Sequence, residues 1–354
     1  MAFKDILLTL TSYPEPTPVA VVEDAVSIAA ALGAHLAAVS CEVHVQVPGN
    51  LLSGSVASIS GIIAGEVEKS RQSAKDLLAA EPSVGEVIYF EHHGSELARG
   101  INLVKLIALL RGRKFQRIWI LDRTIRPALA AMLAGIPERI GPGDGLQRHM
   151  ITNAGIDPRH FRELAMDWLR VLLESMNVPV ASTEPDLKLP ERLLAEIAAR
   201  YQTSRPWIVL ALGGSHPSKD WPDAHHAALL DTLRRRTAGT VFLIGGADNS
   251  ARAQTLIARS AGAPAVNACD LSIVEAAALL RRADLFVGPD SGPMNLAAAG
   301  ATPAFTLFGS TPVLGYSRFI HAIEPEGGQS SDGMTRITPA QVMARIEPYL
   351  NVTK

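Results

Sequence analysis

Short apolar runs alternate with longer stretches of helical periodicity along most of the chain. The runs that predict strands lie at residues 6–10, 35–45, 86–90, 117–121, 206–212, 240–244, 283–287 and 304–308. Apolar residues at helical spacing predict helices at residues 19–32, 62–80, 97–110, 127–133 and 167–176. This alternation is typical of a mostly parallel sheet that is covered by helices, so an α/β fold is expected.

A proline-rich stretch at residues 177–190 divides this pattern into two series. We predict an N-terminal domain whose first part is a βαβα segment over residues 1–80 and whose remainder covers residues 81–180. Residues 181–203 are predicted as a linker and residues 204–354 as a C-terminal domain. Each series has the order of a doubly wound domain, and a cleft between the two domains is expected.

Composition narrows the class of protein. The chain has 354 residues, of which 47% are hydrophobic and 19% charged, and its formal net charge is -2. These values suit two globular domains and argue against a nucleic-acid partner. No apolar run reaches the roughly 18 residues of a membrane span, and the N-terminus lacks a secretory signal. Cys41 and Cys269 have no metal-ligand spacing, so we expect no metal site and a cytoplasmic location.

Three loops in the second series follow predicted strands, where open α/β sheets bind ligands. They read GGSHPSKDWP at 213–222, GGADN at 245–249 and GPDSGPMN at 288–295. The first offers the Ser215 hydroxyl and the Lys219 ammonium to a phosphate. In the third, a strand passes through a tight turn into a helix that Asp290 or Ser291 can cap and that Pro293 suits. The N–H groups at such a helix start bind anions, so the loops together indicate a phosphorylated ligand.

Residues 83–350 resemble glycosyltransferase family 9, the heptosyltransferases that build the lipopolysaccharide inner core. The resemblance lies in the motifs at 213–222, 279–294 and 308–312, and more loosely at 109–111, 115, 118–122 and 133–141. It implies two Rossmann-like domains that face a cleft, the GT-B arrangement. It also implies inverting, metal-independent and cofactor-free transfer of a sugar, expected to be heptose from ADP-heptose. The implied acceptor is a lipid-linked core saccharide, reached from the cytoplasm at the inner membrane surface.

The same resemblance implies a donor site. Its residues would be Gly214, Ser215, Lys219, Asp290, Ser291, Gly292, Pro293 and Asn295. A lysine and helix N–H groups stabilise the charge of a departing diphosphate without a metal. The Asp290 carboxylate repels phosphate, so we expect it to bind sugar or ribose hydroxyls or to cap the helix.

The chain departs from the family pattern in two places. Asn295 stands where family members usually carry His. The family also begins with a strand and a Gly-Asp turn whose aspartate is thought to act as the base, and no such unit is present. Asp5 has no room for a preceding strand, so the catalytic residue is unknown.

The first 80 residues instead resemble the front half of a universal stress protein, through residues 3–8, 22–32 and 33–39. The glycine-rich ATP loop of that family has no copy in the segment. An alternative function is therefore a catalytically impaired protein that binds a nucleotide or nucleotide-sugar.

Other polar residues leave two interpretations open. Arg123 and Arg126 follow a strong strand, where they either hold an anionic acceptor or lie in solvent at a helix start. For Glu275 we favour a structural role at a helix start over a ligand contact. His92 and His93 are expected in solvent or at the acceptor side rather than on a metal. Trp168 and Trp207 are expected in the core.

Overall fold

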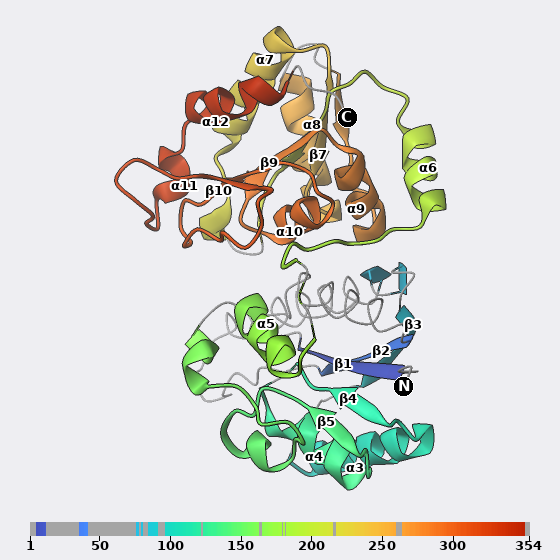
Figure 1. Cartoon of the computed structure of the whole chain (residues 1–354). Coiled ribbons are helices and arrows are strands. Elements are labelled where there is room, and N and C mark those ends of the chain that lie inside the picture. Colours follow the sequence, from blue (N-terminus) through green and yellow to red (C-terminus); the bar gives the residue numbers. More distant parts are fainter. Residues whose placement is uncertain are drawn as a thin grey trace, which may run out of the picture. The chain divides into compact units, whose positions relative to one another are not determined.

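The computed structural model divides into two compact units, Met1–Thr183 and Glu184–Lys354. It describes residues 5–11, 35–41, 76–77, 79–80, 84–90, 96–121, 123–162, 165–178, 180, 182–214, 217–259 and 264–350. Each unit carries parallel strands and helices, as Figure 1 shows for each by itself. The α/β class predicted from the sequence is therefore confirmed.

The first unit contains a parallel sheet of order β1-β2-β3 and a parallel pair β4-β5. Its elements are β1 (Asp5–Thr11), β2 (His35–Cys41), β3 (Val84–Phe90), α3 (Glu96–Arg113), β4 (Arg117–Trp119), α4 (Ile125–Leu133), β5 (Glu138–Ile140), η1 (Gly145–His149), η2 (Pro158–Arg162) and α5 (Ala165–Ser175). Apolar residues of α3 and α4 pack on β4 around Leu110, Ile118 and Ala128. Trp168 of α5 is buried, as predicted. Most residues behind the stress-protein resemblance lie outside the described ranges.

The second unit is built on a six-stranded parallel sheet of order β11-β10-β9-β6-β7-β8. Its strands are β6 (Trp207–Ala211), β7 (Thr240–Ile244), β8 (Ala265–Asn267), β9 (Leu285–Pro289), β10 (Ala304–Leu307) and β11 (Ile320–Ile323). Its helices are α6 (Glu191–Arg200), η3 (Pro217–Lys219), α7 (Asp223–Arg236), η4 (Ala247–Asn249), α8 (Ser250–Arg259), α9 (Ile273–Arg282), α10 (Gly292–Ala299), α11 (Gly333–Arg336), α12 (Pro339–Ile346) and η5 (Glu347–Tyr349).

Helices cover both faces of this sheet. Alternate residues of a strand point to opposite sides, so each face packs against its own set of helices. Residues such as Leu210 and Val287 pack in one core with the apolar faces of α7, α8 and α12. On the other face, the ring of Trp207 meets the rings of Tyr201 and Phe242 edge-on. Tyr201 follows α6, and α6 lies against α9, which in turn contacts α10. The two-sided cover explains why these strands read as continuous apolar runs.

The predicted linker is fastened to the second unit from residue 184 onward. The Leu187 N–H donates to the Ala299 carbonyl at 3.1 Å, and Nη1 of Arg281 donates to the Leu187 carbonyl at 3.1 Å. At the end of this segment, Arg200 forms ion pairs with Asp270 and Glu275. Residues 184–203 therefore lie along the second unit rather than apart from it.

Candidate functional site

The strand order places two of the predicted ligand loops side by side. β6 pairs with β7 on one side and with β9 on the other. The sheet order reverses at this point, and open α/β sheets bind ligands where it does so, beyond the carboxyl ends of the strands. The first loop follows β6 and the third follows β9. The second loop follows the neighbouring strand β7, so all three lie along one edge.

Lys219 and Asp290 join the first loop to the third. Nζ of Lys219 lies 2.9 Å from the Asp290 carbonyl oxygen and 3.0 Å from its Oδ2. The two side chains are 22% and 14% exposed, which shields the pair partly from water. The cation predicted for a phosphate is therefore held at the start of α10, and its charge is balanced by a carboxylate.

The glycines of the first loop let the backbone fold closely over its second half. The Gly214 N–H donates to Oδ1 of Asp220 at 3.4 Å. A Cβ on Gly213 would lie 2.7 Å from that oxygen, and a Cβ on Gly214 would lie 3.0 Å from Cβ of Lys219. A larger residue would push Lys219 out of place. Ser215, the other residue predicted here, lies outside the described ranges.

Arg252 of α8 holds the two ends of the first loop together. Its Nη1 donates to the Leu212 carbonyl, and its Nη2 donates to the Trp221 carbonyl at 3.1 Å. Its Nε lies 2.6 Å from Oδ1 of Asp223. Trp221 is buried and donates from its indole nitrogen to the Ile337 carbonyl at 2.8 Å. Sequence reasoning missed Arg252, because its spacing to the loop carries no local signal.

A neutral histidine lies beneath the same loop. His226 of α7 is 1% exposed, with Nδ1 3.2 Å from the Pro222 carbonyl and Nε2 3.4 Å from the Ala211 carbonyl. Burial, together with the positive charge of Arg252, lowers the pKa of His226 to about 4. The imidazole is therefore uncharged at neutral pH and serves as packing under the carboxyl end of β6.

The start of α10 differs from the prediction in its capping. Ser291 occupies the N-cap position, but its side chain makes no capping hydrogen bond and its Oγ donates to the Pro289 carbonyl at 3.2 Å. The Asp290 carboxylate is taken by Lys219. Pro293 lies in the first turn, as predicted. A Cβ on Gly292 would meet nothing within 4 Å, so the start of this helix is open.

Close packing behind the third loop explains its other glycine. β9 continues through Pro289, two residues beyond the predicted end. A Cβ on Gly288 would lie 2.7 Å from Cβ of Ala211 and 2.6 Å from Cζ of Phe286. Glycine therefore lets β9 approach β6 closely. Ala297, Ala298 and Ala299 are buried, which lets α10 lie close to β9 and β10.

Asn295, in the first turns of α10, is fixed by a residue that the sequence did not point to. The Tyr316 hydroxyl donates a hydrogen bond to Oδ1 of Asn295. Tyr316 comes from the loop between β10 and β11. No motif marks it, since only the fold brings residues 21 positions apart into contact.

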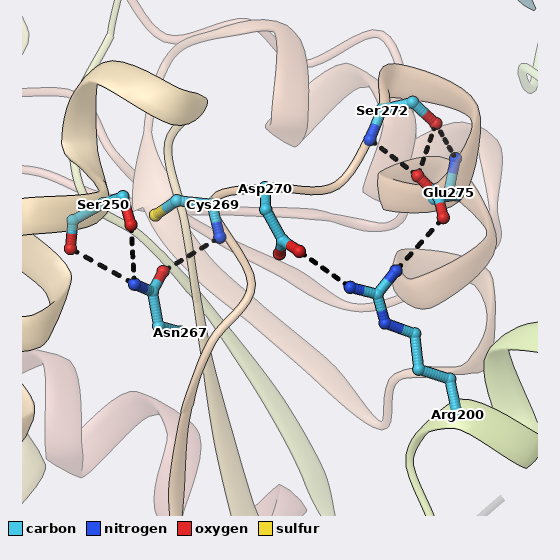
Figure 2. A network of polar contacts seen from close by, with 7 residues as sticks. All are labelled: Arg200, Ser250, Asn267, Cys269, Asp270, Ser272 and Glu275. Carbon is cyan, nitrogen blue, oxygen red and sulfur yellow. Dashed lines mark hydrogen bonds and ion pairs between the residues drawn. The ribbon is translucent and has the colours of Figure 1, made fainter.

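A second polar network lies at the carboxyl end of β8, and Figure 2 shows its members. Nδ2 of Asn267 donates to the carbonyl and hydroxyl of Ser250, and Oδ1 of Asn267 accepts from the Cys269 N–H. Glu275 and Ser272 form a reciprocal capping box at the start of α9. Hydrogen bonds from Ser272 lower the pKa of Glu275. The structural role favoured for Glu275 is confirmed.

The first unit places the two predicted acceptor-side arginines differently. Nη2 of Arg123 lies 2.7 Å from Oδ2 of Asp144, and its guanidinium stacks 4.5 Å from the centre of the Phe161 ring. Arg126 lies half-buried in the first turn of α4. Asp122, His92 and His93 lie outside the described ranges. Thr124 is the N-cap of α4 but makes no side-chain capping bond.

The described residues also bear on two other classes of site. Among them, no three His, Cys, Asp or Glu side chains gather so that they could hold a metal ion. No described helix is both long and apolar enough to cross a membrane.

The parallel sheets of the two units, with glycine-rich loops at the point where the second sheet reverses its strand order, define an α/β protein of the GT-B type with a candidate ligand site. Comparison with known proteins makes the assignment specific: residues 103–322 match glycosyltransferase family 9 (heptosyltransferase), and the chain belongs to this family. It is therefore a glycosyltransferase.

Individual relatives support the assignment to this family. Lipopolysaccharide heptosyltransferase 2 of Salmonella typhimurium is 25% identical over an alignment of 305 residues that covers 78% of this chain and 87% of that protein. The solved structure of ADP-heptose lipopolysaccharide heptosyltransferase II from Escherichia coli has a TM-score of 0.69 at 19% identity and covers 98% of both chains. An Escherichia coli heptosyltransferase solved with ADP has a TM-score of 0.66 at 15% identity, over 97% of each chain.

Proposed function

We propose that this protein transfers heptose from ADP-heptose to a lipopolysaccharide-core acceptor. The observation that carries the proposal is the Lys219–Asp290 pair at the open start of α10, at the point where the sheet order reverses. Relatives named as lipopolysaccharide heptosyltransferases support the donor and the acceptor class.

The proposed donor site is formed by Gly214, Ser215, Lys219, Asp290, Ser291, Gly292, Pro293 and Asn295. In the proposed reaction, an acceptor hydroxyl oxygen attacks the anomeric carbon and gives its proton to a base. The bond from that carbon to the diphosphate oxygen breaks at the same time, which inverts the configuration. Negative charge then grows on the departing ADP. In the proposal, the Lys219 ammonium and the N–H groups at the start of α10 stabilise that charge.

The acceptor half of the proposal is carried by the first unit. We assign contacts with an anionic, lipid-linked saccharide to Arg123 and Arg126. The Arg123 side chain is 46% exposed, so its guanidinium is reachable even while it pairs with Asp144. We further propose that the protein works in the cytoplasm at the inner membrane surface, since the proposed acceptor is a lipid.

The direct test is a turnover assay with ADP-heptose and a heptose-acceptor core lipopolysaccharide. We expect release of ADP and a matching gain of one heptose per acceptor by mass spectrometry. Turnover should persist in EDTA, because Lys219 supplies the positive charge in the proposed reaction. Tight ADP binding without turnover would instead support the impaired binding protein, to which the missing Gly-Asp turn points. Absence of both would contradict the proposed function.

A further inference from the structure

We propose that Tyr316 is a positioning residue of the donor site, which it serves by fixing the side-chain amide of Asn295. The inference rests on the proposed function for the identity of the ligand, but its geometric part stands on contacts within the second unit. Tyr316 lies outside every motif by which the sequence points to the donor site.

The hydrogen bond between the two residues determines which way the amide faces. Tyr316 donates to Oδ1 of Asn295. A planar carboxamide carries its acceptor oxygen and its two N–H donors on opposite sides, so a contact that fixes the oxygen also fixes the donors. Without the tyrosine hydroxyl the amide can turn over and present its oxygen where its N–H groups had been. For an anionic ligand, that rotation replaces attraction by repulsion.

The position of Tyr316 is itself built into the fold. The next residue, Ser317, is buried, and its Oγ donates to Oε2 of Glu184 at 2.7 Å. The backbone N–H of Arg318 donates to Oε1 of the same carboxylate at 2.9 Å. Glu184 thus holds the chain directly after Tyr316 from a segment more than 130 residues away. The hydroxyl therefore approaches Asn295 from an anchored loop.

Because the charges of the site largely balance, a fixed neutral donor would add to the binding of an anionic ligand. Lys219 is already paired with the Asp290 carboxylate at 3.0 Å, so its net attraction for a diphosphate is reduced. Ser291 and Gly292 leave the start of α10 without a side-chain cap. Asn295 follows in the same helix, and in the proposal its side-chain N–H groups add neutral donors to this end. A fixed donor loses less entropy on binding than a mobile one.

A double-mutant cycle, in which each protein is titrated with ADP by isothermal calorimetry, tests the proposal. We expect Tyr316→Phe to weaken ADP binding five- to tenfold and Asn295→Ala to weaken it about as much. Because Tyr316 acts through Asn295, the double variant should bind no more weakly than Asn295→Ala alone. Tyr349→Phe is the matched control. Tyr349 belongs to the same unit and packs on the rings of Phe305 and His321. The ADP affinity of this variant should stay within twofold of that of the wild type.

Two results would overturn the proposal. One is unchanged ADP affinity in Tyr316→Phe; the other is additive losses in the double variant, which would mean that the tyrosine acts independently of Asn295. The side-chain amide resonances of Asn295 in a nitrogen-15 spectrum give a readout without ligand. They should report a rigid amide in the wild type and a mobile one in Tyr316→Phe, and equal mobility in both would also overturn the proposal. If the wild type binds no ADP while the amide behaves as expected, the proposed function fails, and only the part of the inference in which Tyr316 fixes the Asn295 amide stands.

Discussion

The two polar clusters at the carboxyl ends of the second unit's strands use similar residues in different ways. At β8, Arg200 pairs with Asp270 and Glu275, and Glu275 caps α9 together with Ser272. At β6 and β9, Lys219 pairs with Asp290, but the N-cap side chain of α10, Ser291, makes no capping hydrogen bond. In the first cluster, the contacts of Arg200, Ser272 and Glu275 complete a helix start or fasten a helix. In the second, charged groups are brought beside a helix start that is left open.

The difference distinguishes a structural network, whose polar groups satisfy a helix start, from the proposed binding site, whose helix start is left for a ligand. A helix leaves its first N–H groups without intrahelical partners, and a capping side chain satisfies some of them. The Ser272–Glu275 box does so for α9. Among the described residues, the Ser291 side chain at the N-cap of α10 makes no such hydrogen bond, and in the proposed function a ligand oxygen takes its place. We call the carboxyl ends of β6 and β9 the β6–β9 edge, and the carboxyl end of β8 the β8 edge. Substitutions should therefore have strong effects at the β6–β9 edge and weak effects at the β8 edge.

The largest effect is expected from protonating His226 beneath the first loop. Its pKa in the folded protein is about 4, below the ordinary value of 6.5. The unfolded chain therefore binds more protons between pH 6.5 and pH 4, and stability falls as the pH falls through this window. A shift of this size corresponds to about 3 kcal/mol.

Urea unfolding of the wild type and of His226→Gln between pH 7 and pH 4 checks this. On acidification, the free energy of unfolding of the wild type should fall by the contribution of His226, and that of the variant should lack this fall. Parallel pH dependence in the two proteins would show that His226 is not held neutral by the fold.

A smaller effect is expected when Arg252, which joins the two ends of the first loop, is replaced. Arg252→Lys keeps the charge but lacks the planar fork that reaches both the Leu212 and Trp221 carbonyls. We expect ADP affinity to fall about tenfold, or about 1.4 kcal/mol. The matched control is Arg259→Lys, at an exposed position of the same helix, which should bind ADP as the wild type does. Equal affinities of the two variants in calorimetry would contradict the role given to Arg252.

The smallest effect is expected at the β8 edge. Arg200→Ala removes two ion pairs whose side chains are 35% to 63% exposed, and exposed pairs contribute less than about 1 kcal/mol. Unfolding in urea should show a loss within that bound, and ADP affinity should change less than twofold. If Arg200→Ala weakened ADP binding as much as Arg252→Lys, the β8 cluster would belong to the ligand site and the comparison would fail.

Local patterns made much of the second unit predictable. The run at 240–244 became β7 without a change of boundary, because continuous apolar runs between turn signals identify buried parallel strands. Lys219, Asp290 and the start of α10 were found because glycines and a proline mark such turns. The strands β8 and β11 were missed, since their residues are only partly buried and carry a weak apolar signal.

Contacts between distant residues could not be predicted in the same way. The sequence suggested Asp290 as a helix cap or sugar ligand, and only the fold shows that its carboxylate meets Lys219, 71 residues away. Arg252, Tyr316 and Glu184 lie outside the motifs and reach the site through tertiary packing. For Arg123, two interpretations were open, and its pairing with Asp144 appears only when the first unit is folded.

The central claim is that the β6–β9 edge binds the diphosphate of the donor through Lys219. Calorimetric titration of ADP and AMP against the wild type and Lys219→Ala tests it most directly, because the two ligands differ by one phosphate. In the wild type, ADP should bind at least tenfold more tightly than AMP, and in Lys219→Ala that ratio should fall below threefold. An ADP-to-AMP affinity ratio that is the same in both proteins would contradict the claim.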